Sequence, residues 1–190
     1  ESAWLEQVCR IIVDEAGYRF CWIGRAEHGA VKAVTPVAQA GIDEGYLKTL
    51  NITWADTGRG REPTGTCVRT GQTQVVKNIS ADSRLVPWAE DALKHGYASS
   101  IAIPIVVDSE LFGALTIYSA EAEAFPDEEV KLLSELAGDL GYGIATLRTR
   151  GERERAEEEI RALNAELEQR VAARTAQLEK ANRLKDELIV

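Results

Sequence analysis

Cysteine and histidine are the residue types of this chain with the widest chemistry, because thiols and imidazoles bind metals, form disulfides and act as nucleophiles. The three cysteines, Cys9, Cys21 and Cys67, are odd in number and widely spaced. This pattern favours reduced thiols in a cytoplasmic protein over a disulfide framework. His28 and His95 lie far from the cysteines and from each other in the sequence. No zinc-binding spacing can therefore be written, and no metal site is predicted.

The segment GREPTGTC, residues 60–67, has the glycine spacing of a phosphate-binding loop. In such loops, a lysine after the second glycine neutralises the bound phosphates. This chain has Thr66 at that position, so triphosphate binding is not predicted. Cys67 ends the segment, in a loop region where a reactive thiol would be useful.

Periodic apolar residues predict the elements that must position these side chains. Helices are expected over residues 3–16, 42–50, 86–95 and from 126 onward, and strands over 18–26, 31–39, 73–78, 99–107 and 111–119. Pro104 predicts an edge or bulged position in its strand, because proline donates no hydrogen bond to a neighbouring strand. The long irregular segment 54–63 is where a compact domain places a functional loop.

The net negative charge of the chain arises from its first three quarters. The whole chain has a net charge of -9, from 22 basic and 31 acidic residues. Residues 148–190 hold ten of each sign, so residues 1–147 carry the whole acidic excess. Phosphate backbones and anionic membranes repel such a body, which argues against nucleic-acid binding. No apolar run approaches the ~20 residues of a membrane span, so no membrane segment is predicted in this fragment.

Residues 160–190 carry an apolar seam at coiled-coil spacing, with steps of three and four residues. The seam positions are Ile160, Leu163, Leu167, Val171, Arg174, Leu178, Ala181, Lys185 and Leu188. Two consecutive steps of four after Leu163 form a stutter, which locally unwinds a supercoil. A lone helix cannot bury such a seam, so a parallel homodimer is predicted. Ion pairs at i, i+4 spacing, such as Glu166 with Arg170, would also support a solvated lone helix.

Three stretches of the chain together resemble a GAF domain, a sensory fold common in bacterial signalling proteins. They are GYRFCWIGRAE, GQTQVVKNISADSRLVPWAEDALKHGYASSIAIPI and ELFGALTIYSAEAEAFPDEEVKLLSELAGDLGYGIATLR. The segment ALNAELEQRVAARTAQLEKANRLKDELIV is similar to the linker that precedes the phosphoacceptor helix of sensor histidine kinases. The resemblance implies a GAF sensor domain over residues 1–150 and a coiled-coil signalling helix over residues 151–190, leading to an absent kinase core.

The fold implied by this resemblance is α+β, with a central antiparallel sheet, helices on one side and a long C-terminal coiled-coil helix. The implied function is cytoplasmic sensing of an unknown small molecule in a two-component sensor histidine kinase, with the downstream kinase domains as partners. The phosphorylated histidine is expected a few residues beyond Val190. The chain itself is therefore not predicted to be an enzyme, and no catalytic residue is assigned.

GAF domains bind small molecules between the sheet and the loops over one of its faces. Aromatic side chains with a few polar groups are the usual lining of such a cavity. The candidate pocket residues are Trp22, Trp54, Cys67, Arg84, Trp88, Tyr97, Ser99 and Tyr118, with Ser100 as a further hydrogen-bonding group. For a strand residue such as Trp22, an ordinary core position is the alternative, because half of all strand side chains face inward.

Relatives with cofactors or enzymatic activity leave further alternatives. Bilin-binding GAF domains attach their chromophore to a cysteine, and the matching place holds Pro87 or Trp88, so a covalent bilin is not predicted. Haem would need an axial ligand such as His28 or His95. The cofactor is therefore unknown, and a sensor with a non-covalent cofactor stays open. Some GAF proteins reduce free methionine sulfoxide with cysteines, so a redox enzyme around Cys67 also stays open.

In GAF proteins the first and last helices commonly pack as a bundle across a twofold axis. The predicted dimer interface therefore joins helices 3–16 and 127–147 to the coiled-coil seam. Its residues are Trp4, Val8, Ile12, Leu133, Leu136, Leu140, Ile144, Leu147, Ile160, Leu163, Leu167, Val171, Leu178 and Leu188. A ligand-free GAF spacer that only dimerises is an alternative function with the same interface.

Overall fold

The computed structural model describes residues 1–43, 45–47, 51–82 and 85–187, without the side chains of residues 86, 87, 182 and 184–187. In chain order these residues form α1 (Ser2–Asp14), β1 (Phe20–Ala26), β2 (Val34–Gly41), the 3-10 helix η1 (Arg59–Arg61), α3 (Pro63–Thr70), β3 (Gln74–Val76), α4 (Val86–Lys94), β4 (Ser99–Val107), β5 (Glu110–Ser119) and α5 (Asp127–Glu187). They divide into two compact units, Glu1–Ala145 and Thr146–Val190. Of the helix predicted over 42–50, residues 44 and 48–50 lie outside the described residues.

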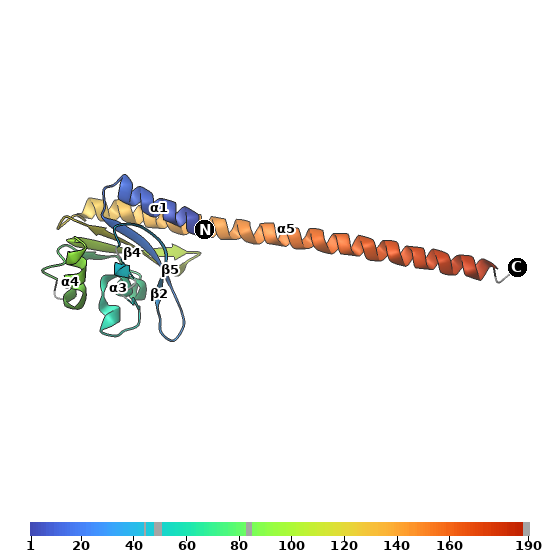
Figure 1. Ribbon diagram of the computed structural model, residues 1–190, viewed down its shortest axis with the longest axis horizontal. Coiled ribbons are helices and arrows are strands. Elements are labelled where there is room, and N and C mark those ends of the chain that lie inside the picture. Colours follow the sequence, from blue (N-terminus) through green and yellow to red (C-terminus); the bar gives the residue numbers. More distant parts are fainter. Residues whose placement is uncertain (44, 48–50, 83–84, 188–190) are drawn as a thin grey trace. The chain divides into compact units, whose positions relative to one another are not determined.

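A five-stranded antiparallel sheet, in the order β2-β1-β5-β4-β3, forms the centre of the first unit (Figure 1). Trp22 lies opposite Thr116, and Ser100 lies opposite Tyr118. Because successive side chains of a strand point to opposite faces, these four residues share one face of the sheet. Leu115, the neighbour of Thr116, faces the other side.

Helices cover both faces of this sheet. On one face, α1 and the first part of α5 share an apolar core with side chains such as Leu115. On the other face, α3 and α4 contribute Cys67 and Ala92 to a second core, and Figure 1 shows these two helices across the sheet from α1. The prediction that the helices lie on one side of the sheet thus holds only for the two long helices, α1 and α5. The short helices have apolar faces of their own, and these are buried against the opposite side of the sheet.

The predicted interface residues of α1 and α5 separate by burial. Ile12, Leu133, Leu140 and Ile144 are buried against the sheet of their own chain. Trp4, Val8 and Leu136 pack at the edge of that core, and Leu147 is exposed. A helix that covers a sheet uses its main apolar stripe for that contact. The four buried residues therefore belong to the core of the subunit and are not available to a partner.

One glycine allows α5 to lie close to β4. A Cβ atom at Gly141 would be 2.0 Å from the carbonyl oxygen of Val106. Glycine costs about 1 kcal/mol relative to alanine inside a helix. The close approach of the helix backbone to the strand requires glycine here in spite of that cost.

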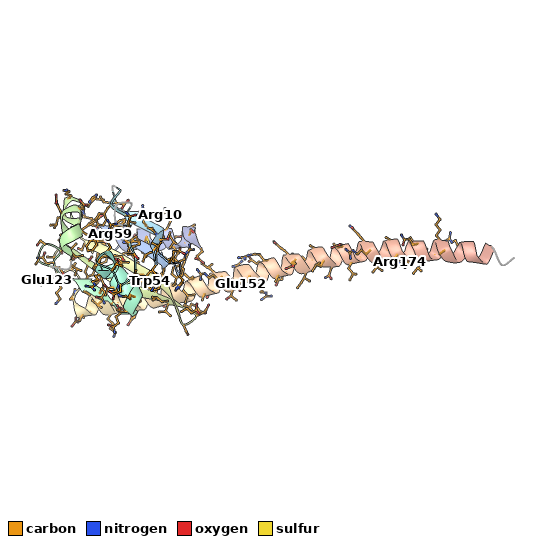
Figure 2. All side chains as sticks on the ribbon, turned by 90° about the horizontal axis from the view of Figure 1, so that it is seen from below. Arg10, Trp54, Arg59, Glu123, Glu152 and Arg174 are labelled. Atoms are coloured by element: carbon orange, nitrogen blue, oxygen red, sulfur yellow. The ribbon has the colours of Figure 1, made fainter. Side chains whose placement is uncertain are left out.

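The second unit consists of α5 from Thr146 onward, and the helix passes through Gly151 without a break. Its seam residues are exposed, with 58% for Ile160, 57% for Leu163, 59% for Leu167, 56% for Val171 and 54% for Leu178. Figure 2 shows charged side chains such as Glu152 and Arg174 along the same helix. Leu188 lies outside the described residues. Nowhere in the described part of the chain is a helix both long enough and apolar enough to cross a membrane.

Candidate ligand pocket

A pocket lies on the sheet face that α3 and α4 cover, and we call it the sheet pocket. Its polar and aromatic lining consists of Tyr46, Glu62, Thr64, Trp88, Ser100, Thr116 and Tyr118. The rest of the lining is apolar and includes Ile52, Pro63, Ile79, Leu85, Ala89 and Ala92. The cavity volume is ≈ 20 Å³, enough for about one water molecule. Any larger ligand must therefore move part of this lining.

Glu62 enters the pocket because it caps α3. Its backbone is extended, Pro63 opens the helix behind it, and its carboxylate accepts hydrogen bonds from the N–H groups of Thr64, at 2.9 Å, and Gly65. Proline at the first helical position and a carboxylate at the N-terminus both favour this arrangement. A Cβ at Gly65 would lie 2.3 Å from the carbonyl oxygen of Thr53, so glycine allows α3 to pack against that loop.

Burial raises the pKa of Glu62 from 4.5 to about 7, although the N–H groups of Thr64 and Gly65, the Thr64 hydroxyl and the charge of Arg69 all lower it. Arg69 itself donates to the carbonyl oxygen of Gly60 at 2.6 Å and to the Thr66 hydroxyl at 3.2 Å. It therefore holds the loop before α3 and makes no ion pair with Glu62 in the described structure. Near neutral pH the charged and uncharged forms of this carboxyl group are therefore about equally populated.

A pair of threonine hydroxyls joins α3 to the sheet at the floor of the pocket. The Oγ1 atoms of Thr64 and Thr116 are 3.1 Å apart, and both side chains are buried. The Thr64 hydroxyl also interacts with the Glu62 carboxylate. Ser100, on the neighbouring strand β4, adds a third hydroxyl to the lining. These groups can donate or accept hydrogen bonds to a ligand.

Aromatic rings form the wall beside these hydroxyls. The Tyr118 ring centroid lies 5.8 Å from that of Tyr46, edge to face, and 4.7 Å from that of Tyr97. Burial raises the pKa of both the Tyr46 and the Tyr118 hydroxyl, and the nearby charge of Glu62 raises both further. Both phenols therefore remain protonated near neutral pH and can donate hydrogen bonds.

Two of the eight predicted pocket residues, Trp88 and Tyr118, line the sheet pocket, and so does Ser100. Trp88 extends from α4 and is half-buried. Ser99 points to the opposite face, where its hydroxyl donates to the carbonyl oxygen of Glu121 at 2.6 Å. Arg84 lies outside the described residues.

The other predicted residues have structural positions near the pocket but do not line it. Trp22 is fully buried in the core on the pocket face, and within the described structure its Nε1 atom has no hydrogen-bond partner. Tyr97 is also buried, and its hydroxyl donates to the carbonyl oxygen of Ile42. Cys67 is buried on α3, where burial raises its thiol pKa to about 12. These three residues belong to the core on the pocket face of the sheet.

Trp54 is held away from the pocket by the connection between β1 and β2. Its Nε1 donates to the carbonyl oxygen of Glu27 at 3.0 Å, and the Lys32 ammonium lies 4.6 Å from its ring centroid. Its ring also meets the edge of His28 at 5.7 Å. Trp54 therefore stabilises the loop between β1 and β2 and does not line the sheet pocket.

Sequence reasoning missed Tyr46, Glu62, Thr64 and Thr116. A signal for Glu62 is present in the residues that follow it, since a polar residue before Pro-Thr-Gly can cap a helix that starts at the proline. No grouping of three or more histidine, cysteine, aspartate or glutamate side chains that could hold a metal ion occurs within the described ranges.

Comparisons with known proteins agree with this fold. The GAF domain family matches residues 1–145 of the chain. No sequence among curated proteins matches.

Three solved structures illustrate the similarity, which at these identities concerns the fold alone. A domain described as that of a two-component sensor histidine kinase from Sinorhizobium meliloti 1021 is 19% identical with a TM-score of 0.60, over 80% of this chain and 95% of that one. The GAF domain of a phosphoenolpyruvate-protein phosphotransferase from Coxiella burnetii is 19% identical with a TM-score of 0.62, over 80% and 86%. A type II free methionine-R-sulfoxide reductase from Thermoplasma acidophilum is 17% identical with a TM-score of 0.57, over 74% and 88%. With the family match spanning most of its length, the chain belongs to the GAF domain family.

Proposed function

We propose that this chain is the cytoplasmic small-molecule-sensing module of a two-component sensor histidine kinase, and that the sheet pocket binds its ligand. The observation that carries the proposal is the convergence of a carboxyl group, several hydroxyls and a tryptophan on one cavity that apolar side chains close. A few polar groups in an apolar cavity are the usual composition of a small-molecule site. The histidine kinase context comes from the similarity of residues 162–190 to a kinase linker.

Ligand binding requires a change in the pocket, because its cavity of ≈ 20 Å³ has room for about one water molecule. Trp88 and Ala89 place α4 along one wall of the pocket, and α4 is a short helix, Val86–Lys94. We infer that this wall separates from the sheet when the ligand enters. The ligand then stabilises the open conformation by binding it more tightly than the closed one.

The output of the module is a parallel homodimer through the second unit. Five seam residues of α5 between Ile160 and Leu178 are each more than half exposed. An apolar seam of this length at heptad spacing is stable when a second helix covers it. The same seam would serve a ligand-free GAF spacer that only dimerises, and ligand binding separates these two functions.

A thermal-shift screen of metabolites tests the sensing function, because a ligand raises the midpoint of unfolding by mass action. Thr116→Val keeps the shape of the side chain and removes its hydroxyl, so it should weaken any ligand that raises the midpoint. Thr35→Val, at an exposed position of β2, is the matched control. If no compound gives a stabilisation that Thr116→Val reduces, the spacer function stands in place of the sensor.

The dimer and its role in signalling need separate measurements. Light scattering of the double variant Leu163→Ala and Leu167→Ala should report monomers, and Arg161→Ala should leave the dimer intact. In the full-length protein, one residue inserted between Gly151 and Glu159 rotates the following helix by about 100°. Kinase output should change with that insertion and recover with seven inserted residues, which restore the heptad phase. If neither the one-residue nor the seven-residue insertion changes kinase output, transmission through the helix is excluded.

A further inference from the structure

Resting on the proposed function, we propose that the sheet pocket selects a small organic cation, an ammonium ion whose positive charge lies against Glu62 and the rings of Trp88 and Tyr46. Anionic and neutral ligands of similar size are the competing classes. The charges, the aromatic rings and the N-terminus of α3 each favour the cation.

The charge of the pocket is the first reason. Among the described residues that line it, Glu62 is the charged one, and none is lysine or arginine. Arg69, the cation closest along α3, is engaged with the carbonyl oxygen of Gly60 and the hydroxyl of Thr66. Within the described residues, the half-buried carboxylate of Glu62 makes no ion pair, although the charge of Arg69 acts on it. Removing a carboxylate from water costs free energy, and a ligand of opposite charge offsets that cost.

The second reason is the aromatic lining. Trp88, Tyr46 and Tyr118 all border the same cavity as Glu62. Aromatic faces attract ammonium ions through the ring quadrupole, most strongly when the cation is desolvated. A carboxylate together with several rings therefore selects an ammonium ion over a neutral molecule of the same shape.

The third reason is that the site where an anion would bind is already occupied. Free N–H groups at a helix N-terminus attract phosphate or carboxylate ligands. In α3, the N–H groups of Thr64 and Gly65 already donate to Glu62. A phosphate in this pocket would meet a carboxylate instead of a set of donors, so phosphorylated ligands are disfavoured.

Cation binding should depend on pH, because the ammonium ion pairs with the carboxylate form of Glu62. The titratable groups that face Glu62 are Tyr46, Tyr118, Cys67 and Arg69, and Asp91 on α4 acts on Tyr46. Burial raises the pKa of Glu62 to about 7, so the carboxyl group is mostly protonated at pH 6 and mostly ionised at pH 8. The association constant should rise about tenfold between these two values.

The test compares choline chloride with its uncharged isostere 3,3-dimethylbutan-1-ol, using the whole chain, calorimetry and thermal unfolding at pH 6 and pH 8. Inorganic phosphate and sodium chloride complete the set of probes. We expect choline to bind and the isostere and phosphate to bind at least about tenfold more weakly, which corresponds to about 1.4 kcal/mol. Glu62→Gln should abolish the pH dependence and weaken choline binding, Trp88→Leu should weaken it at both pH values, and Glu110→Gln, at the exposed hairpin end of β5, should change nothing.

The outcomes separate this inference from the proposed function. If the isostere or phosphate binds as tightly as choline or more tightly, and Trp88→Leu abolishes that binding, the preference for a cation is wrong. The pocket then remains a ligand site. Choline binding that both Glu62→Gln and Trp88→Leu leave unchanged overturns the inference as well, because the cation then binds elsewhere. Failure of every probe overturns it too, and the proposed function is then decided separately by the metabolite screen. If Glu62→Gln does not fold, Trp88→Leu and the pH dependence of the wild-type chain decide.

Discussion

Glu62→Gln should remove part of the pH dependence of the free energy of unfolding of the first unit. The folded carboxyl has a pKa of about 7, against 4.5 for an ordinary glutamate. Between these two values the folded protein keeps a proton that the unfolded chain has lost. The free energy of unfolding contributed by Glu62 is therefore fully present below about pH 4.5 and decreases as the pH rises to about 7.

The size of this effect follows from the two pKa values. Each pH unit between them contributes about 1.36 kcal/mol, so the whole change is roughly 3 kcal/mol. Glutamine does not titrate and keeps one oxygen that can accept from the N–H groups at the start of α3. The lost second acceptor costs about 1 kcal/mol at every pH. The stability of wild type minus that of the variant should thus fall by roughly 3 kcal/mol from pH 4.5 to pH 8 and change sign on the way.

Urea unfolding followed by tryptophan fluorescence measures this difference in the right part of the chain, since all four tryptophans lie within residues 1–145. Glu110→Gln, an exposed carboxyl at the hairpin between β4 and β5, controls for the loss of one negative charge. Its effect should stay within about 0.5 kcal/mol. A Glu62→Gln difference that is flat within about 0.5 kcal/mol across the range would refute the burial of an ionisable group in this pocket.

Three further experiments test the packing of the first unit. Gly113→Ala should lower the free energy of unfolding by about 1–3 kcal/mol or more, because its Cβ would lie 1.8 Å from the carbonyl oxygen of Gly24. Gly29→Ala, with nothing within 4 Å of its Cβ, should change the free energy of unfolding by no more than about 1 kcal/mol. Urea unfolding compares the two variants. Leu140→Ala should lower the free energy of unfolding by about 2–5 kcal/mol. Leu132→Ala, at a position that is 60% exposed, should lower it by about 0.5 kcal/mol or less. Equal losses in the two variants would contradict the assignment of Leu140 to the core. Iodoacetamide at pH 8 should label none of the three buried cysteines before urea is added, because burial raises the pKa of Cys67 to about 12; rapid labelling of Cys67 in the native protein would instead favour a cysteine-based enzyme.

Most of the fold could be predicted from the sequence because periodicity and turn residues are local signals. Strands β4 and β5 and the start of α5 lie where the apolar pattern places them. The expected effect of Pro104 is also found. Strand β3 pairs with β4 only from Ser100 to Ala102, so Pro104 lies where β4 has no such neighbour, and the register with β5 shifts between Ile105 and Val106.

The pocket was harder to predict because residue type does not determine which face of a strand a side chain occupies. Ser99 and Ser100 are adjacent and chemically identical, yet only Ser100 lines the pocket. Their faces depend on the pairing with β5, which is a non-local contact. Glu62 was missed for a related reason, since a glutamate in a polar loop is ordinarily solvated, and its burial depends on how α3 packs on the sheet.

The division between core and dimer interface follows the same rule. Leu140 and Ile144 have the helical spacing that suits either a sheet or a second helix. Only the three-dimensional arrangement shows that the sheet of the same chain covers them. The exposed seam from Ile160 onward has no such cover within the second unit, so the prediction of an interface there is untouched by this correction.

The alternation along β5 also provides a physical connection between the sheet pocket and α5 within the first unit. Thr116 lines the pocket, and its neighbours Leu115 and Ile117 share the opposite core with Leu140. Because peptide units are planar and rigid, a ligand that displaces Thr116 also displaces both neighbours. A close-packed core transmits that displacement instead of absorbing it. Under the proposed function, a difference of about 1–3 kcal/mol in ligand affinity between two positions of β5 would be enough to bias α5 through this strand.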